Sequence, residues 1–190
     1  MDSSLELNNE KIISYLTFKL GDELFAANVS KVLNILELSR ITKVPKAPSY
    51  MKGVINLRGD ILPIVDTRLK FGMDETPFTS STCIIVLIID FNGESIHIGG
   101  LVDSVQEVLE IEDKAILLPP SIGSVYRSDF IKGVVEHDDT FIMLLDVEKV
   151  FTDAELSAIN VTDEVELNEN KPVSAKESID SNMRIFSETE

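Results

Sequence analysis

The chain has 190 residues, of which 44% are hydrophobic, so it is long enough to bury the core of one good-sized domain or of two small ones. Its 33 acidic residues outnumber 17 basic ones, and the net charge of -16 argues against nucleic acid and anionic membranes as partners. The longest apolar run, residues 83–89, is too short to cross a bilayer, the N-terminus shows no export signal, and a single cysteine suits a reducing cytoplasm.

Most apolar segments are short, β-branched and bounded by turn residues, which predicts strands. Residues 12–20 and 23–29 are two such segments joined by a Gly-Asp turn. Residues 83–89 and 95–98 are two more, joined by an Asn-Gly turn that is typical of hairpins. Residues 29–38 fit either a half-buried strand or a short helix. Because helical periodicity is scarce elsewhere, the sequence predicts an all-β architecture.

An internal repeat relates two parts of the chain. Residues 50–71 resemble residues 130–151 at a constant shift of 80 (130 − 50). Upstream blocks near residues 21–32 and 92–105 match at a slightly smaller shift, because a loop changes length between the matched blocks. Two related β units of this size indicate two related barrel halves that share an apolar interface, since each is too small to bury a core comfortably alone. Chance similarity among short apolar strands is the competing explanation.

The chain changes character near its C-terminus. Thr152 to Glu155 has the capping-box pattern, with Leu156 and Ile159 following on one helical face, so a short closing helix is expected there. Residues 161–190 are acidic and contain few large apolar residues, which predicts a disordered tail. The folded domain is therefore expected to span residues 11–160.

The sequence offers little catalytic or metal-binding chemistry. No nucleophile has a recognisable base beside it, and no glycine loop has phosphate-binding spacing. Glu136-His137-Asp138-Asp139 is the most metal-like run, but adjacent residues of an extended chain point to opposite faces, and the repeat places the run at a hairpin turn. We therefore expect no enzymatic activity, no metal and no cofactor.

The stretch NLRGDILPIVD, residues 56–66, places polar residues between two apolar segments. Gly59 is expected to relax the backbone at a hairpin tip, and Pro63 suits an edge or bulge position because it donates no ladder hydrogen bond. Arg58 would then be held at the surface. It either binds a carboxylate or carbonyl of a partner, or stabilises its own domain through a bond to a neighbouring acidic residue or Asn34.

The segments YMKGVINLRGDILPIVDTRLKFG and FIKGVVEHDDTFIMLLDVEKVF resemble the CheW family of chemotaxis coupling proteins, and the likeness extends from about residue 12 to residue 160. The resemblance implies two small five-stranded SH3-like barrels sharing a hydrophobic interface, with short helices. It also implies a non-enzymatic cytoplasmic adaptor. Its implied partners are a CheA-type histidine kinase and the cytoplasmic domain of a methyl-accepting chemotaxis receptor, without direct membrane insertion. The acidic tail lies outside the family pattern.

Matching positions carry the family's partner-binding residues over to this chain. Val32, Gly53 and Arg58 match positions where coupling to receptor and kinase has been mapped. The family often has Glu where this chain has Asn34, which weakens the case for a salt bridge from this position to Arg58. Apolar side chains at the barrel junction would form a groove of the kind that takes an amphipathic helix. The predicted partner-binding residues are Val32, Asn34, Gly53, Arg58, Cys83, Gly99, Val105 and Val108.

Other assignments remain open. The same module occurs as the regulatory domain of the kinase itself, and in CheV-type adaptors fused to a receiver domain. The 190 residues leave no room for a kinase or receiver domain, which favours a stand-alone adaptor, but a fragment of a longer chain would look the same. A small enzyme is the alternative from another class, and the missing nucleophile–base pair counts against it.

Overall fold

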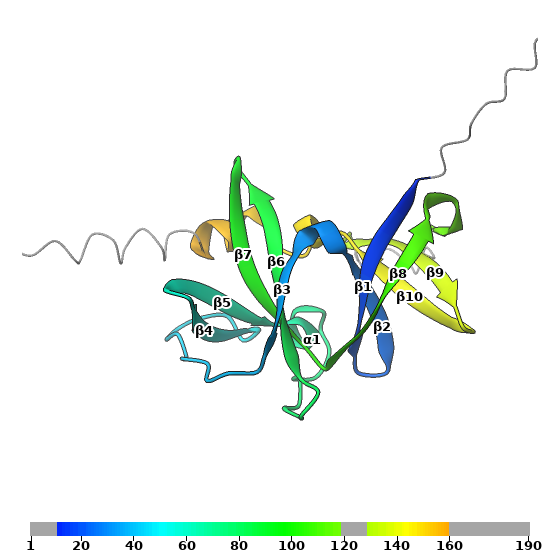
Figure 1. Ribbon diagram of the computed structural model, residues 1–190. Helices are drawn as coiled ribbons and strands as arrows, with labels where there is room; N and C mark the ends of the chain where they lie inside the picture. Colours follow the sequence, from blue (N-terminus) through cyan, green and yellow to red (C-terminus); the bar gives the residue numbers. More distant parts are fainter. Residues whose placement is uncertain (1–10, 119–128, 160–190) are drawn as a thin grey trace, which may run out of the picture.

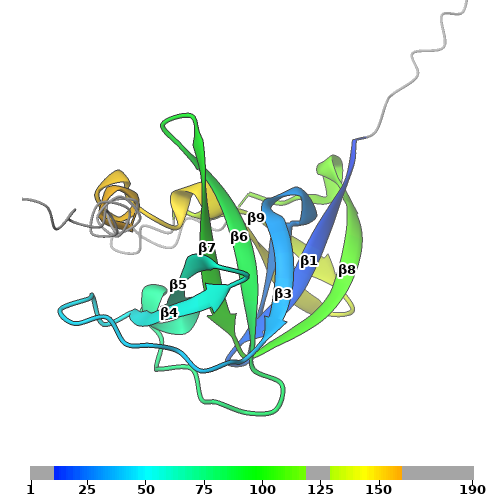
Figure 2. The same cartoon turned by 60° about the vertical axis from the view of Figure 1, so that its left-hand side comes forward.

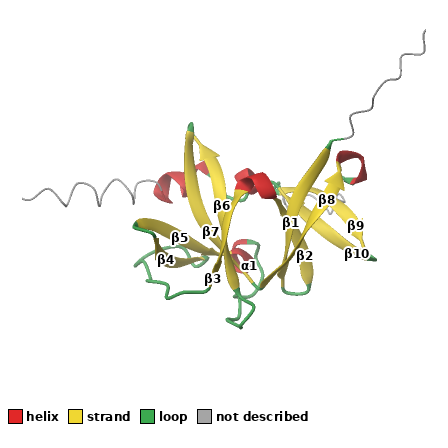
Figure 3. Ribbon diagram, in the orientation of Figure 1, coloured by secondary structure: helices red, strands yellow, loops and turns green. Residues whose placement is uncertain are grey.

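A computed structural model describes residues 11–118 and 129–159 of the chain (Figure 1). This part contains ten strands arranged in two five-stranded sheets, which confirms the predicted all-β fold. Figure 3 shows that the helical segments are short and connect or follow strands. None of the described helices is long and apolar enough to cross a membrane. The predicted acidic tail, residues 161–190, lies outside the described residues.

The first sheet, which we call barrel A, takes its strands from both ends of the chain. β1 (Ile12–Leu20) and β2 (Glu23–Asn28) form an antiparallel hairpin where the sequence predicted one. The other strands are β8 (Ser104–Glu112), β9 (Ile131–His137) and β10 (Thr140–Leu145). Their order is β8-β1-β2-β10-β9, and β2 and β10 run parallel.

The second sheet, barrel B, takes its strands from the middle of the chain. They are β3 (Val32–Glu37), β4 (Met51–Leu57), β5 (Asp60–Asp66), β6 (Cys83–Phe91) and β7 (Glu94–Val102). Their order is β3-β6-β7-β5-β4, with β5 and β7 parallel. β7 is longer than predicted because Gly99 and Gly100 continue the strand.

A short bridge brings the two edges of each sheet together, which gives both sheets a barrel form. In barrel B, Thr42, which follows β3, exchanges both backbone hydrogen bonds with Val54 of the opposite edge strand, β4. In barrel A, Leu117, which follows β8, makes the equivalent pair with Val134 of β9. The two bridges match under the repeat, since Val54 and Val134 are 80 residues apart.

Helical turns mark the ends of the β segments. η1 (Val29–Lys31) leads from barrel A into β3, so residues 29–38 contain both the short helix and the strand that the sequence left open. α1 (Thr67–Lys70) follows β5, η2 (Asp113–Ala115) follows β8, and η3 (Val147–Lys149) follows β10.

The two halves of the sequence are not the two halves of the fold. β4, β5 and α1 each begin 80 residues before β9, β10 and η3, as the repeat predicted. However, barrel A joins β1 and β2 of the first repeat to β8, β9 and β10 of the second, and barrel B joins the remaining strands. Among the described strands the chain therefore changes barrel twice, at η1 and at Asp103, and each core needs strands from both repeats.

An apolar core joins the barrels, in addition to the core inside each one. Successive residues of β1 alternate between the two, with Tyr15 facing the inside of barrel A and Leu16 facing the junction. In β6, Ile84 faces the inside of barrel B and Ile85 the junction. These strands are buried on both faces, which explains their nearly continuous apolar sequences. The interface core consists of Leu16, Phe18, Leu20, Phe25, Ala27, Ile85, Val102 and Leu145.

The predicted capping box begins the C-terminal helix, residues 153–159. The Thr152 hydroxyl accepts a hydrogen bond from the Glu155 backbone N–H at 3.3 Å, and the Glu155 carboxylate accepts one from the Thr152 N–H at 2.8 Å. Leu156 and Ile159 are buried in a cluster with β5 and β7. The helix therefore packs against barrel B.

Candidate docking surface

Cys83 and Val105 connect the two barrels at one edge of their junction. Cys83 opens β6 of barrel B, and Val105 lies in β8 of barrel A. Burial raises the pKa of the Cys83 thiol, while a hydrogen bond from the Val105 backbone N–H lowers it by less. The thiol therefore stays protonated at neutral pH and behaves as an apolar side chain. Both residues, together with Val32, pack against the interface core.

Beside this contact, two edge strands expose apolar side chains. Leu33 and Ile35 of β3 are 50% and 43% exposed, and Val108 of β8 is 54% exposed. β3 and β8 are edge strands of their sheets, and Figure 2 shows β3, β1 and β8 next to one another on one side of the molecule. We call Leu33, Ile35 and Val108, together with the half-buried Val32, Cys83 and Val105, the docking surface.

A bulge shapes the β8 side of the docking surface. Pairing between β1 and β8 shifts where Leu16 lies opposite Val108 and Phe18 lies opposite Val105. Between them the buried Thr17 hydroxyl donates to the Glu107 carbonyl at 2.8 Å and accepts from the Glu107 N–H at 3.1 Å. The hydroxyl therefore bonds both backbone groups of Glu107, which has no partner residue in β1 at the bulge.

Asn34 lies on the same exposed edge. Its side-chain oxygen accepts a hydrogen bond from the backbone N–H of Ile35 at 2.8 Å. Among the described residues the side chain makes no hydrogen bond to Arg58. Asn34 therefore does not provide the intramolecular tie to Arg58 that was one of the sequence-based alternatives.

Arg58 lies at the tip of the β4–β5 hairpin. Arg58 and Gly59 have φ angles of 59° and 106°, and the Asn56 side chain accepts a hydrogen bond from the Gly59 N–H at 3.0 Å. A two-residue loop with both φ angles positive matches the twist of an antiparallel hairpin. Arg58 is exposed and makes no ion pair or hydrogen bond within residues 11–118 and 129–159. Within the described fold, the tip therefore leaves the guanidinium available for another partner.

Pro63 was expected on an edge strand or at a bulge, but its strand, β5, lies inside the sheet between β4 and β7. Pro63 is opposite Val54, whose backbone groups bond to Thr42 instead. Pairing of β5 with β7 begins only at Ile64. Pro63 lacks a backbone N–H, but neither β4 nor β7 needs a hydrogen-bond donor at this position. Proline is therefore tolerated here although β5 lies inside the sheet.

Gly53 and Gly99 are buried, in contrast to the other predicted site residues. Gly53 has a φ of 139°, and an added Cβ would lie 2.1 Å from the Thr42 carbonyl oxygen of the closing bridge. A Cβ at Gly99 would lie 2.5 Å from the Ile64 side chain. Both positions need glycine for close packing inside barrel B, so substitutions there change the fold before they change any surface.

The predicted site residues thus fall into three groups. Val32, Asn34, Cys83, Val105 and Val108 gather along the barrel junction, Arg58 lies on a separate tip, and the two glycines lie inside barrel B. Sequence reasoning missed the exposed Leu33 and Ile35, because apolar residues in a strand are usually assigned to a core. The available signal was that residues 32–36 are apolar on both faces of a strand.

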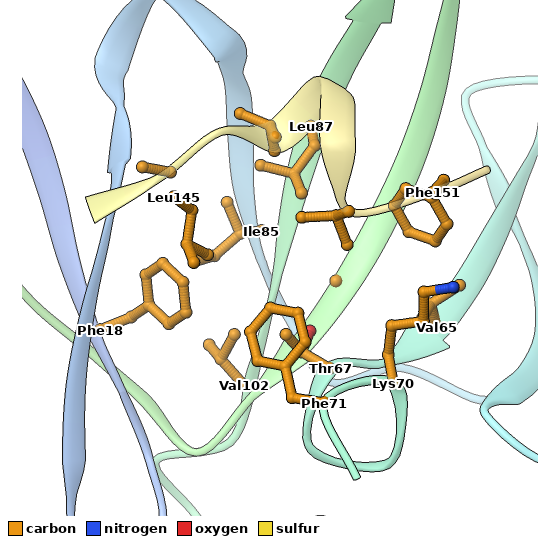
Figure 4. A pocket seen from close by; sticks show the side chains of 14 residues that line it. Phe18, Val65, Thr67, Lys70, Phe71, Ile85, Leu87, Val102, Leu145 and Phe151 are labelled. Atoms are coloured by element: carbon orange, nitrogen blue, oxygen red, sulfur yellow. The ribbon is translucent and has the colours of Figure 1, made fainter. Parts of the chain in front are cut away.

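An apolar pocket lies deeper in the junction. Figure 4 shows Phe18 and Val102 on one side of it, Phe151 and Lys70 on the other, and Phe71 in the middle. The Lys70 ammonium is bound to Glu155, and Thr67 is the other polar residue of an otherwise apolar lining. Among the described residues no cluster of three or more His, Cys, Asp or Glu side chains is placed to hold a metal ion.

Comparison with known proteins assigns this two-barrel fold. Residues 14–155 match the CheW-like domain family. The chain belongs to this family. Chemotaxis protein CheW from Rhizobium meliloti is 36% identical over 143 residues, which cover 75% of this chain and 90% of that protein. CheW from Klebsiella aerogenes is 30% identical over 146 residues, covering 77% of this chain and 86% of that protein.

A solved structure supports the same assignment. The scaffolding protein TtCheW from Thermoanaerobacter tengcongensis superimposes with a TM-score of 0.67 at 28% sequence identity, covering 76% of this chain and 97% of that chain. The CheW resemblance read from the sequence, and the paired five-stranded architecture that it implied, are both confirmed.

Proposed function

We propose that this CheW-like chain is a non-enzymatic adaptor in bacterial chemotaxis signalling, which couples a CheA-type histidine kinase to the cytoplasmic tips of methyl-accepting chemoreceptors. Family membership over residues 14–155 is the observation that carries the proposal, because relatives across most of this length are named as chemotaxis proteins. The solved neighbour is named as a scaffolding protein. The adaptor works in the cytoplasm and reaches the membrane array only through its partners.

The docking surface fits a helical partner segment. Leu33, Ile35 and Val108 expose apolar area on two edge strands, and an amphipathic helix contributes a complementary apolar stripe. Such a helix buries these side chains without requiring a conformational change in the interface core. Arg58, which has no partner within the described residues, can bind a carboxylate or carbonyl of the receptor or the kinase.

A reconstituted mixture of receptor fragment, adaptor and kinase tests the coupling role. The wild-type protein should co-sediment with both partners and support receptor-stimulated kinase activity. Arg58→Glu should lower that activity sharply, since the reversed charge repels the group that Arg58 binds. Asp138→Lys is the matched control, because Asp138 lies at the equivalent hairpin tip of barrel A, also with a positive φ, 47°. Normal activation by Arg58→Glu would contradict the role assigned to Arg58.

Val108→Asp tests the docking surface. Val108 is a cleaner probe than the half-buried Val105, whose substitution would disturb the interface core. An unpaired carboxylate against an apolar helix should weaken receptor binding while circular dichroism and the melting temperature stay unchanged. Unchanged receptor binding by a folded Val108→Asp protein would show that β8 is not part of the receptor interface. Failure of the wild-type chain to bind either partner would overturn the adaptor function itself.

A further inference from the structure

One edge of barrel B is basic in an otherwise acidic protein. Between Leu38 and Gly59 the chain has five basic residues and no acidic one, although its net charge is -16. Lys52, one of the five, is bound to Glu75. The other four are exposed and make no ion pair or hydrogen bond within the part of the chain that the structure describes. These four, which we call the basic edge, are Arg40, Lys43, Lys46 and Arg58.

The basic edge is continuous because its segment runs along one strand. Thr42 pairs with Val54 of β4, and the Met51 N–H donates to the Pro48 carbonyl at 2.9 Å. β4 is one of the two edge strands of barrel B, and Arg58 follows its last residue. The four cations therefore lie along β4 and the segment that pairs with it. The described acidic residues beside them are Glu75, which is paired with Lys52, and Asp60, which begins β5, so the edge keeps an excess of positive charge that attracts an acidic segment.

The C-terminal helix ends beside this edge. The Tyr50 hydroxyl, four residues after Lys46, donates to the Glu155 carboxylate at 2.5 Å, and Tyr50 and Met51 pack against the cluster that holds the helix. In Figures 1 and 2 the orange helix lies at the same end of the molecule as β4 and β5. The chain therefore leaves the described fold at Ile159 next to the start of β4.

The sequence that follows has the complementary charge. Residues 161–190 contain eight acidic and three basic residues, a net charge of -5 (3 − 8). At about 3.3 Å for each extended residue, the segment is long enough to reach every part of the basic edge. A tethered segment is also present at an effective concentration in the millimolar range, so weak individual charge pairs suffice for binding.

We propose that the acidic segment 161–190 binds the basic edge of its own chain. The contact covers the β4 edge of barrel B and partly neutralises the charge around Arg58. An acidic partner that approaches this edge must displace the segment. The inference rests on charge and on the place where the chain leaves the fold, and does not depend on the proposed adaptor role.

Zero-length carbodiimide cross-linking of the full chain, read by mass spectrometry, tests the proposal. The reagent joins lysine amines to carboxylates that contact them. Lys43 and Lys46 should form cross-links to residues 161–190 several-fold more often than the exposed lysines of barrel A, after normalisation to each amine's reactivity with a neutral acylating reagent. The excess should disappear at about 0.5 M salt, where screening shortens the range of charge attraction. The comparison lysines are Lys11, Lys19 and Lys132.

An equal mixture of nitrogen-15-labelled and unlabelled protein separates contacts within one chain from contacts between copies. Cross-links at Lys43 and Lys46 should join peptides of the same isotope. Mixed-isotope pairs would show that the acidic segment binds a second copy, which overturns the proposal. An even distribution of cross-links over all exposed lysines, or an excess that persists at high salt, would overturn it as well.

Discussion

Arg68 and Glu148 occupy equivalent positions in the two repeats, 80 residues apart, and make equivalent ion pairs of opposite sign. Arg68 lies 3.3 Å from the Asp103 carboxylate, and Glu148 lies 2.5 Å from the Lys31 ammonium. Asp103 and Lys31 are located where the chain crosses between the barrels. Each crossover is thus bound to the helical turn that follows the hairpin of one repeat. The acidic residue is on the crossover in the Asp103–Arg68 pair and on the helical turn in the Lys31–Glu148 pair.

Additional bonds make each ion pair a link between the barrels. Asp103 also accepts a hydrogen bond from the Gly21 N–H of the β1–β2 turn at 2.6 Å. Lys31 also binds Asp90 of β6 at 2.7 Å, and the hydrogen bonds that Lys31 donates to the Asp90 and Glu148 carboxylates raise its pKa. The two ends of the interface core are therefore held by polar contacts as well as by packing.

Asp103→Asn should destabilise the protein more than Lys31→Met. The Arg68 and Asp103 side chains are only 16% and 21% exposed, so loss of the charge leaves a largely buried guanidinium without its counter-ion, at a cost of about 1–3 kcal/mol. The partners of Lys31 are 59% and 47% exposed, and exposed pairs contribute less than about 1 kcal/mol. Urea unfolding of both variants measures the difference. Equal losses would show that exposure does not decide the strength of these links.

Glu155 should make the stability of the C-terminal helix depend on pH. Burial raises its pKa, but hydrogen bonds from Lys70, Thr152 and Tyr50 outweigh burial and lower the pKa from 4.5 to about 2. A carboxyl whose pKa is depressed on folding contributes stability above its unfolded pKa, and this contribution is lost as the pH falls from about 4.5 towards 2. Glu155→Gln should therefore be less stable than wild type at pH 7.

The difference between the two proteins should shrink as the pH falls through this window. Its size at neutral pH should be at most about 3 kcal/mol, which corresponds to the shift in pKa. Melting temperatures of wild type and Glu155→Gln, measured from pH 7 to pH 2.5, test this pattern. All other carboxylates are the same in both proteins, so their contributions cancel in the difference. A difference that stayed constant with pH would indicate that the ionised form of Glu155 is not preferentially stabilised.

Tyr15 and Thr17 should respond oppositely to removal of their hydroxyl groups. Among the described residues the Tyr15 hydroxyl has no hydrogen-bond partner, although the side chain is only 1% exposed. Tyr15→Phe removes a buried unsatisfied group and should be neutral or stabilising by about 1 kcal/mol. The Thr17 hydroxyl bonds both backbone groups of Glu107, so Thr17→Val should cost about 1–3 kcal/mol. Chemical denaturation of the two variants measures both changes in the free energy of unfolding.

Gly53→Ala should act through the fold and not through a binding surface. The left-handed backbone conformation costs about 1–3 kcal/mol for an alanine, and the added Cβ must push the Thr42 carbonyl away and break the closing bridge of barrel B. Gly72→Ala is the matched control, since Gly72 also has a positive φ, 78°, but has no atom within 4 Å of an added Cβ. A larger loss of melting temperature for Gly53→Ala is expected. Similar losses would show that the backbone alone sets the cost.

The sequence predicted individual strands and turns well, but it did not predict that each barrel combines strands from both repeats. β1 matches its predicted bounds, and the shift of 80 residues located β9 and β10 from β4 and β5. Strand partners depend on contacts between distant segments, and the parallel pairs of β2 with β10 and of β5 with β7 leave no local pattern in either strand. The repeat shows which strands are related, but it does not show which strands meet.

The candidate site shows the same limit. The position of Arg58 at a hairpin tip followed from the turn residues around it, because turn chemistry is local. The positive φ of Arg58 itself was not predicted, since arginine seldom adopts it, and the two-residue loop length required it. Exposure of Leu33 and Ile35 depends on which strand forms the sheet edge, a property of the whole fold.

Arg58→Gly should separate the coupling role of Arg58 from its structural role. A left-handed conformation is strained for arginine and open to glycine, so the variant should be as stable as wild type or more stable by up to about 1 kcal/mol. The same change removes an exposed guanidinium that has no partner within the described residues. Receptor-stimulated kinase activity should therefore fall while the melting temperature stays the same or rises.

Arg58→Lys keeps the charge and the backbone strain, so partial activity is expected unless the planar guanidinium is required. If Arg58→Gly lost stability and activity together, Arg58 would have a structural role that the observed contacts do not explain. If it kept full activity at unchanged stability, the hairpin tip would not take part in coupling.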